Sequence, residues 1–168
     1  MNKPRAVLDE RIMGYLGQTT IIRLATITPA GLPHVAPFWF AANRDRIVIS
    51  TLANQTVRNL TANRECALLV DLGTDFRDLR GALIHGQARV WRDGDDVPTE
   101  VRTLHDQIER VHAHELTEPE FERYDSWETR DHIYLEIVPR AATWFDLGLA
   151  AMGRTGQGSG RPIGPAAS

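Results

Sequence analysis

Residues 20–42 read TIIRLATITPAGLPHVAPFWFAA, and this stretch decides the fold that the sequence predicts. Two runs rich in β-branched and aromatic residues, 20–28 and 33–42, flank the four residues PAGL. Pro and Gly at such a position are typical of a tight turn, and a link of this length joins neighbouring antiparallel strands. The stretch therefore predicts a β-hairpin.

The rest of the chain supplies more strands and three helices. A short opening helix is predicted because Val7, Leu8, Ile12 and Leu16 recur at helical spacing. Apolar runs of strand length lie at 46–51, 66–72, 79–91, 132–139 and 141–147. Helical patterns lie at 56–63 and within 95–116. Six or seven strands in hairpin order predict a mainly β (α+β) chain, an antiparallel barrel with flanking helices.

Composition indicates one domain, expected to span residues 1–148. Residues 149–168 are rich in Gly, Ala, Ser and Pro and read as a C-terminal tail. The net charge is −3 and basic residues form no run, so the chain is not expected to bind nucleic acid. With one cysteine, Cys66, the chain can form no internal disulfide, which suits a reducing compartment. No apolar stretch approaches about 18 residues, so we expect a cytoplasmic protein without a membrane partner.

Most familiar catalytic motifs are absent from the sequence. It contains no GxGxxG after the first strand, no GxxxxGK[ST], no CxxC and no GxSxG. The order of elements also excludes an alternating dinucleotide-binding fold. No residue can therefore be assigned a catalytic role from a motif.

Residues 50–60, STLANQTVRNL, gather polar side chains where a predicted strand ends and a helix begins. The first turn of a helix has backbone N–H groups without intrahelical partners and a partial positive charge, which suits a phosphate group. Arg58 is the one positive side chain in this stretch. A simpler interpretation is that Asn54, Gln55 and Thr56 cap and open the helix.

Taken together, residues 23–71 resemble the N-terminal half of the pyridoxamine 5'-phosphate oxidase-like, FMN-binding split-barrel family. The resemblance rests on the hairpin pattern ATI…G.PHV.P.WF and on RNL in the following helix. It covers about residues 20–90, and more loosely IYLEIVPRAATWFDLG at 133–148. It is closest to the branch of flavin- and deazaflavin-dependent oxidoreductases.

The resemblance implies a homodimer of split barrels that binds FMN in the groove between subunits. The deazaflavin coenzyme is the alternative cofactor. The implied activity is hydride transfer to or from a small organic substrate. Residues of the first strand, including Leu24 and Ala25, and residues of the second strand, including Phe38, would line the groove. Trp144 would come from the other subunit. The implied cofactor-binding residues are Arg23, Thr26, Pro37, Trp39, Ser50, Thr51, Gln55, Thr56, Arg58, Arg80 and Trp144.

Several positions depart from the family pattern. Gln55 and Thr56 stand where the family often has basic residues, and Thr28 stands where it often has Lys. Gly81 stands where the oxidase has a Gln that contacts the ring. Strict pyridoxamine phosphate oxidase activity is therefore not expected.

Other interpretations stay open at this stage. The barrel could be a non-catalytic carrier of haem or of a cofactor, with His34 or His85 as a haem ligand, or a structural dimer without a ligand. His105, Glu109 and His112 follow i, i+4, i+7 spacing and could hold a metal, although a solvated or interface edge explains them more simply. No metal site is predicted.

Overall fold

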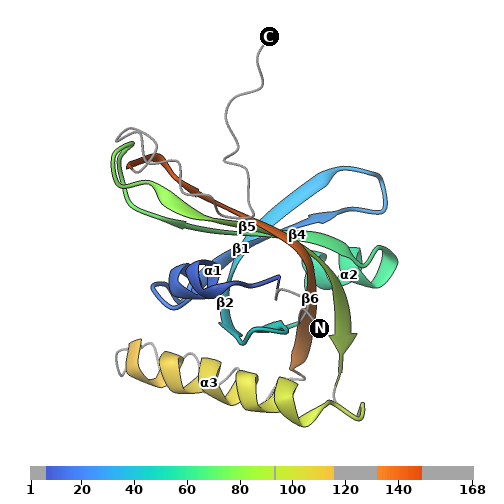
Figure 1. Cartoon of the computed structure of the whole chain (residues 1–168). Coiled ribbons are helices and arrows are strands. Elements are labelled where there is room, and N and C mark those ends of the chain that lie inside the picture. Colours follow the sequence, from blue (N-terminus) through green and yellow to red (C-terminus); the bar gives the residue numbers. More distant parts are fainter. Residues whose placement is uncertain (1–6, 93, 116–131, 149–168) are drawn as a thin grey trace, which may run out of the picture.

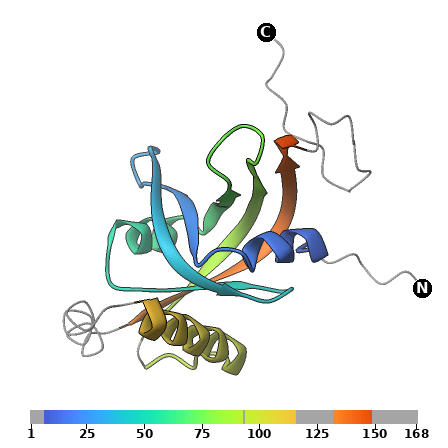
Figure 2. The same ribbon diagram turned by 90° about the vertical axis from the view of Figure 1, so that its left-hand side faces the viewer.

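The computed structural model of the protein describes residues 7–92, 94–115 and 132–148. Within them, six antiparallel strands close into a barrel in the order β1-β2-β3-β6-β5-β4 (Figures 1 and 2). The strands are β1 (Ile21–Ile27), β2 (Pro33–Ala42), β3 (Ile47–Thr51), β4 (Glu65–Leu72), β5 (Arg80–Trp91) and β6 (Ile133–Asp146). The helices are α1 (Glu10–Leu16), α2 (Gln55–Ala62) and α3 (Thr99–Glu115). The predicted fold class is confirmed.

The predicted hairpin is formed by β1 and β2, with Ile21 opposite Trp39 and Ile27 opposite Pro33. Its turn needs a glycine, because Gly31 has a φ of 81°, which residues with a side chain rarely adopt. The Gly31 N–H donates to the Thr28 carbonyl oxygen at 2.8 Å. The hairpin projects beyond the barrel in Figure 1.

The sequence predicted two strands at the C-terminal end of the barrel, and this prediction was wrong. A single strand of 14 residues, β6, runs through Pro139. Proline has no N–H to donate to a neighbouring strand. The register shifts at this point, because His85 of β5 is paired with Ala141 and Gly86 with Pro139, so that Arg140 of β6 is the extra residue. This bulge allows β6 to continue past Pro139 as one strand.

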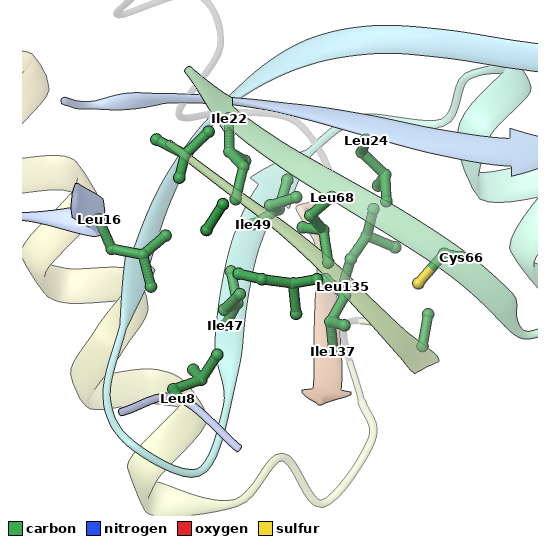
Figure 3. Close-up of a cluster of buried hydrophobic side chains, with 14 of the residues drawn as sticks. Leu8, Leu16, Ile22, Leu24, Ile47, Ile49, Cys66, Leu68, Leu135 and Ile137 are labelled. Atoms are coloured by element: carbon green, nitrogen blue, oxygen red, sulfur yellow. The ribbon is translucent and has the colours of Figure 1, made fainter. Parts of the chain in front are cut away.

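The inside of the barrel is filled by aliphatic side chains from the strands and from α1 (Figure 3). Leu8 and Leu16 enter this core from α1 and the residues before it, and both are less than 5% exposed. Cys66 is also part of the core, where burial raises its thiol pKa to about 12. Cys66 therefore serves as a packing residue.

Helix α3 covers the outer face of β2 and β3, beneath the barrel in Figure 1. Its apolar stripe, Val101, Leu104 and Ile108, packs on Ala41 and Val48. In the described part of the chain, no helix combines the length and apolar character that crossing a membrane requires. The proposed tail, 149–168, lies outside the described residues.

Candidate functional site

A pocket of about 450 Å³ opens where β3 ends and α2 begins. Register brings its walls together, because Ile21 of β1 is opposite Trp39 of β2, and β2 pairs with β3. Four residues predicted from the sequence, Pro37, Trp39, Ser50 and Thr51, meet here. The lining residues are Ile21, Pro37, Phe38, Trp39, Ser50, Thr51, Leu52 and Asn54.

The pocket has two chemical characters. Phe38, Trp39 and Pro37 give it an aromatic and apolar side, whereas Ser50 and Thr51 give it hydroxyl groups at the strand end. A pocket of this size with mostly apolar lining and a few polar groups is typical of a small-molecule site. The arrangement suits a flat ring system that carries a polar or charged substituent.

Helix α2 begins at the polar end of the pocket. The Asn54 side chain caps the helix, since its Oδ1 accepts a hydrogen bond from the Val57 N–H at 3.0 Å. Asn54 Nδ2 donates to Thr51 Oγ1 at 2.8 Å. The capping interpretation is therefore confirmed for Asn54. Helix geometry leaves the N–H groups of Gln55 and Thr56 without intrahelical acceptors, and of the two only the half-buried Gln55 can offer its N–H to an anionic group.

A chain of hydrogen bonds runs from this first turn into the barrel. Arg58 donates to Gln55 Oε1 through Nε at 3.2 Å and Nη2 at 2.7 Å. Gln55 Nε2 donates to Asn59 Oδ1 at 2.7 Å, and Asn59 Nδ2 donates to Thr26 Oγ1 at 2.9 Å. The bond between Asn59 and Thr26 thus holds α2 against β1, and Gln55 holds the Arg58 guanidinium at the first turn. Thr56 is 1% exposed as a whole residue, so neither its hydroxyl nor its backbone N–H is open to a ligand.

Three further predicted residues, Arg23, Arg80 and Trp144, do not line this pocket. Arg23 is on the outer face of β1 and forms an ion pair with Asp71. Arg80 donates to Gln18 Oε1 at 3.3 Å. Trp144 packs against the core, and the Arg11 guanidinium lies 4.2 Å from the centre of its ring. Arg80 and Trp144 therefore both lie beside α1 or the residues that follow it.

A histidine pair beside Ser50 was not found from the sequence. Ser50 Oγ lies 3.2 Å from His132 Nδ1, and the His132 ring lies 5.9 Å from that of His105. Burial lowers the pKa of His105, and the neighbouring His132 lowers it further. His132 comes 82 residues after Ser50, so only the pairing of β3 with β6 could have revealed the contact.

The histidine alternatives can now be placed. His34 is opposite the buried Thr26, whereas His85 is opposite Ala67, which is opposite Ala25. Because Thr26 and Ala25 are neighbours in one strand, the two histidines lie on opposite faces of the sheet. They do not converge on one ligand.

The helical cluster on α3 is the other histidine alternative. His105 Nδ1 lies 3.8 Å from Glu109 Oε1, and the side chain of His112 lies outside the described residues. Among the described side chains, no group of three or more His, Cys, Asp or Glu is placed to hold a metal ion.

Comparison with known proteins agrees with this architecture. The chain is similar in structure to the conserved hypothetical protein Rv2991 from Mycobacterium tuberculosis, with 21% identity, a TM-score of 0.66 and coverage of 96% of this chain and 98% of that one. It is similar to an F420 reductase (21% identity, TM-score 0.52, coverage 85% and 98%). It is also similar to HutZ, the heme storage protein from Vibrio cholerae (15% identity, TM-score 0.61, coverage 83% and 94%).

These structural similarities show the fold alone, because every identity is low. Among curated proteins, the search finds no match. The sequence model of the family described as pyridoxamine 5'-phosphate oxidase matches residues 8–131, which is most of the chain. The region includes the hairpin, the pocket and α2. The chain therefore belongs to the pyridoxamine 5'-phosphate oxidase family.

Proposed function

We propose that this protein is a cofactor-dependent oxidoreductase that binds FMN, or a deazaflavin coenzyme, in the pocket between β2 and α2. The observation that carries the proposal is the pocket itself, which joins an aromatic wall to a polar strand end and a helix start. Membership of the family supports it independently.

The described residues have distinct roles in this proposal. Trp39 binds and orients the ring and excludes water from one side of it, while Phe38, the next residue of β2, packs toward the barrel core and supports this wall. The Ser50 hydroxyl group and the Gln55 N–H at the start of α2 bind the phosphate, while Thr51, which is 4% exposed and accepts a hydrogen bond from Asn54, positions the helix start. When bound, the flavin or deazaflavin supplies hydride transfer.

Phosphate binding would depend on few positive charges. Arg58 is fixed at the first turn through Gln55, so its guanidinium lies close to the helix start. A hydrogen bond to a charged group contributes about 1.5 to 3 kcal/mol, so Arg58 is the main electrostatic contribution from a side chain of α2. With so few positively charged side chains, this site is expected to bind phosphate more weakly than relatives with more basic residues.

FMN is the first choice of cofactor because the family is named for a flavin-dependent oxidase. The deazaflavin coenzyme is the alternative, and the similarity to an F420 reductase supports it. This chain and the F420 reductase are only 21% identical, so a binding experiment must decide between the two cofactors.

We further propose that the protein is a homodimer, with Arg80 and Trp144 of one subunit completing the groove of the other. Apolar side chains are exposed on the projecting hairpin, where Leu32 is 63% and Val35 is 60% exposed. Exposed apolar residues grouped in this way are typical of an interaction surface. The hairpin is therefore the proposed contact surface between subunits.

The cofactor proposal is tested by titrating the purified protein with FMN and, separately, with the deazaflavin coenzyme. We expect saturable binding of one of them in the micromolar range. Trp39→Ala removes the aromatic wall and is expected to weaken binding by about tenfold, because one stacking contact contributes about 1 kcal/mol or more. His85→Ala is the matched control, since His85 is an exposed strand residue outside the pocket. Failure to bind either cofactor would contradict the proposal.

Haem binding is the outcome that would favour the carrier interpretation. Titration with haemin, followed by its absorption near the Soret band, tests this directly. Because His34 and His85 lie on opposite faces of the sheet, we expect neither His34→Ala nor His85→Ala to abolish a specific haem spectrum. A spectrum that disappears with one of these variants would revive the haem hypothesis.

A further inference from the structure

A second pocket, of about 390 Å³, lies between the end of α2 and the end of β5, and we call it the α2–β5 pocket. It exists because β4 begins at Glu65, opposite Gln87, so that the last residues of β5 extend past β4. Helix α2 lies beside this part of β5 instead (Figure 1). The lining residues are Leu60, Thr61, Arg64, Ala88, Arg89, Val90, Trp91 and Arg92.

The charge of the α2–β5 pocket is opposite to that of the chain. Arg64, Arg89 and Arg92 line it, and no carboxylate of the described residues does, whereas the whole chain has 19 basic and 22 acidic residues. None of the three forms an ion pair with a carboxylate in the described residues. Guanidinium groups gathered without counter-charges repel one another, and an anion between them would relieve that repulsion.

Among the described residues, two acidic groups near the lining arginines in sequence or in the sheet, Asp95 and Glu136, have other partners. Asp95 Oδ2 accepts a hydrogen bond from the Arg92 backbone N–H at 2.7 Å. Glu136 is opposite Arg89 in the sheet, but it is 3% exposed and accepts hydrogen bonds from Arg46 and Trp91. The three guanidinium groups therefore keep donors for a ligand.

Two of the lining residues are fixed in place before any ligand arrives. Arg64 Nε donates to the Ala88 carbonyl oxygen at 3.0 Å, which leaves its terminal NH₂ groups as donors. The Trp91 ring is held because its Nε1 donates to Glu136 Oε2 at 3.0 Å. Such positioning reduces the entropy that binding would lose.

We infer that the α2–β5 pocket binds a compact polyanion that carries two or more phosphate or carboxylate groups. Arginine forks match both groups, and three positive charges favour a ligand with more than one negative charge. At roughly 30 Å³ per water molecule, the volume is several times that of a single small ion. The pocket lies at the opposite end of α2 from the cofactor pocket, whose lining includes Asn54, so the inference stands whether or not a flavin binds.

The test is calorimetric titration of the full chain, without cofactor, in a buffer of low and constant ionic strength. Pyrophosphate and citrate are the polyanions, and acetate is the singly charged control. We expect saturable binding of pyrophosphate, citrate or both, and none of acetate. Pyrophosphate alone would assign a phosphate-bearing ligand, and citrate alone a polycarboxylate. Binding of neither would overturn the inference.

Variants separate this site from a general effect of charge. Arg89→Ala and Arg92→Ala are each expected to weaken binding by about tenfold or more, because each removes charge-assisted hydrogen bonds. Arg110→Ala is the matched control, since Arg110 is an exposed arginine of α3 that does not line the pocket. Equal losses in all three variants would overturn the inference. FMN titration of Arg89→Ala is expected to match the unmodified protein, which keeps failure of this site distinct from failure of the cofactor site.

Discussion

Glu136 brings a carboxylate into the barrel wall, and at 3% exposure it is the one buried charged side chain among the described residues. Its two oxygens have separate partners, since Oε1 accepts from Arg46 at 2.9 Å and Oε2 from the Trp91 indole at 3.0 Å. These bonds join three elements, because β6, β5 and the residue before β3 each supply one partner. The Glu136 side chain therefore links β6, β5 and the start of β3 through its hydrogen bonds.

Replacing Glu136 with Ala is expected to destabilise the fold by about 3 kcal/mol, because it leaves a partly buried guanidinium and an indole N–H without their acceptor. Urea unfolding measures the change. Arg44→Ala is the control, since the Arg44–Glu10 ion pair is exposed, with side-chain exposures of 57% and 89%, and should change stability by less than about 1 kcal/mol. Equal losses in both variants would contradict this account.

His105 makes stability depend on pH. Its pKa is lowered from the ordinary value of 6.5 by burial and by His132, while Asp106 opposes the shift. Tyr134 contacts the ring, and Glu109 at 3.8 Å is too distant for a hydrogen bond to offset burial. The unfolded chain therefore takes up a proton more readily than the folded one.

The sign of the effect follows from that difference. As the pH falls below about 6.5, the unfolded state gains the proton first, and stability is lost until the pH passes the folded pKa. His105→Gln should flatten this loss between about pH 7 and pH 5, measured by the urea midpoint at each pH. His85→Gln changes an exposed histidine and should leave the profile unchanged. An unaltered slope in His105→Gln would show that another group causes the loss.

Gly81, one of the positions at which the sequence was expected to differ from the oxidase, lies at a close contact between strands. Gly81 of β5 is opposite Asp71 of β4 and Phe145 of β6. A Cβ atom at this position would overlap the Val70 carbonyl oxygen and crowd the Phe145 ring. Close contact between strands therefore accounts for a glycine at this position.

Gly81→Ala is accordingly expected to destabilise the protein by at least about 2 kcal/mol, because the strands must separate to admit the methyl group. Gly14→Ala is the matched control in α1, where a Cβ meets no atom within 4 Å. This control should raise stability by about 0.5 to 1 kcal/mol, since alanine favours a helix. Thermal unfolding of the two variants should therefore shift in opposite directions, and a shared direction would contradict the explanation.

Local patterns predicted most elements well. The hairpin, β3, α2, β4 and β5 were each placed within one or two residues, because alternation, turn residues and capping are encoded locally. The two strands predicted in place of β6 were wrong because the chain continues past Pro139 through a bulge at Arg140, which only the pairing with β5 reveals. The pairing of distant strands was beyond local reasoning.

The candidate site shows the same division. Pro37, Trp39, Ser50 and Thr51 could be placed from the sequence, and the structure brings them into one pocket. Arg64, Arg89 and Arg92 could not be grouped beforehand, because 25 residues and a change of strand separate the first two. The hydrogen bonds that Gln55 and Thr26 each form with Asn59 could be recognised only in the structure, where α2 lies on β1.

For the whole molecule, the projecting hairpin leads to a prediction about assembly. Val35→Glu places a charge on the proposed subunit contact and should convert a dimer into a monomer, because a buried unpaired charge opposes association. Light scattering coupled to size-exclusion chromatography measures the mass.

The control for assembly is Val111→Glu on α3, where Val111 is 36% exposed on a different face. It should leave the mass of the assembly unchanged. A monomeric unmodified protein, or a Val35→Glu variant that remains dimeric, would exclude the hairpin as the contact surface.

The strand order also has a consequence for synthesis of the chain. β6 is made last, yet it lies between β3 and β5 in the closed barrel. Until residues 133–146 leave the ribosome, β3 and β5 each have an unpaired edge, and such edges bind other strands readily. At about 5 to 20 residues per second, this exposed period lasts for several seconds. Nascent chains that stall before Ile133 are therefore the form of this protein most prone to aggregate.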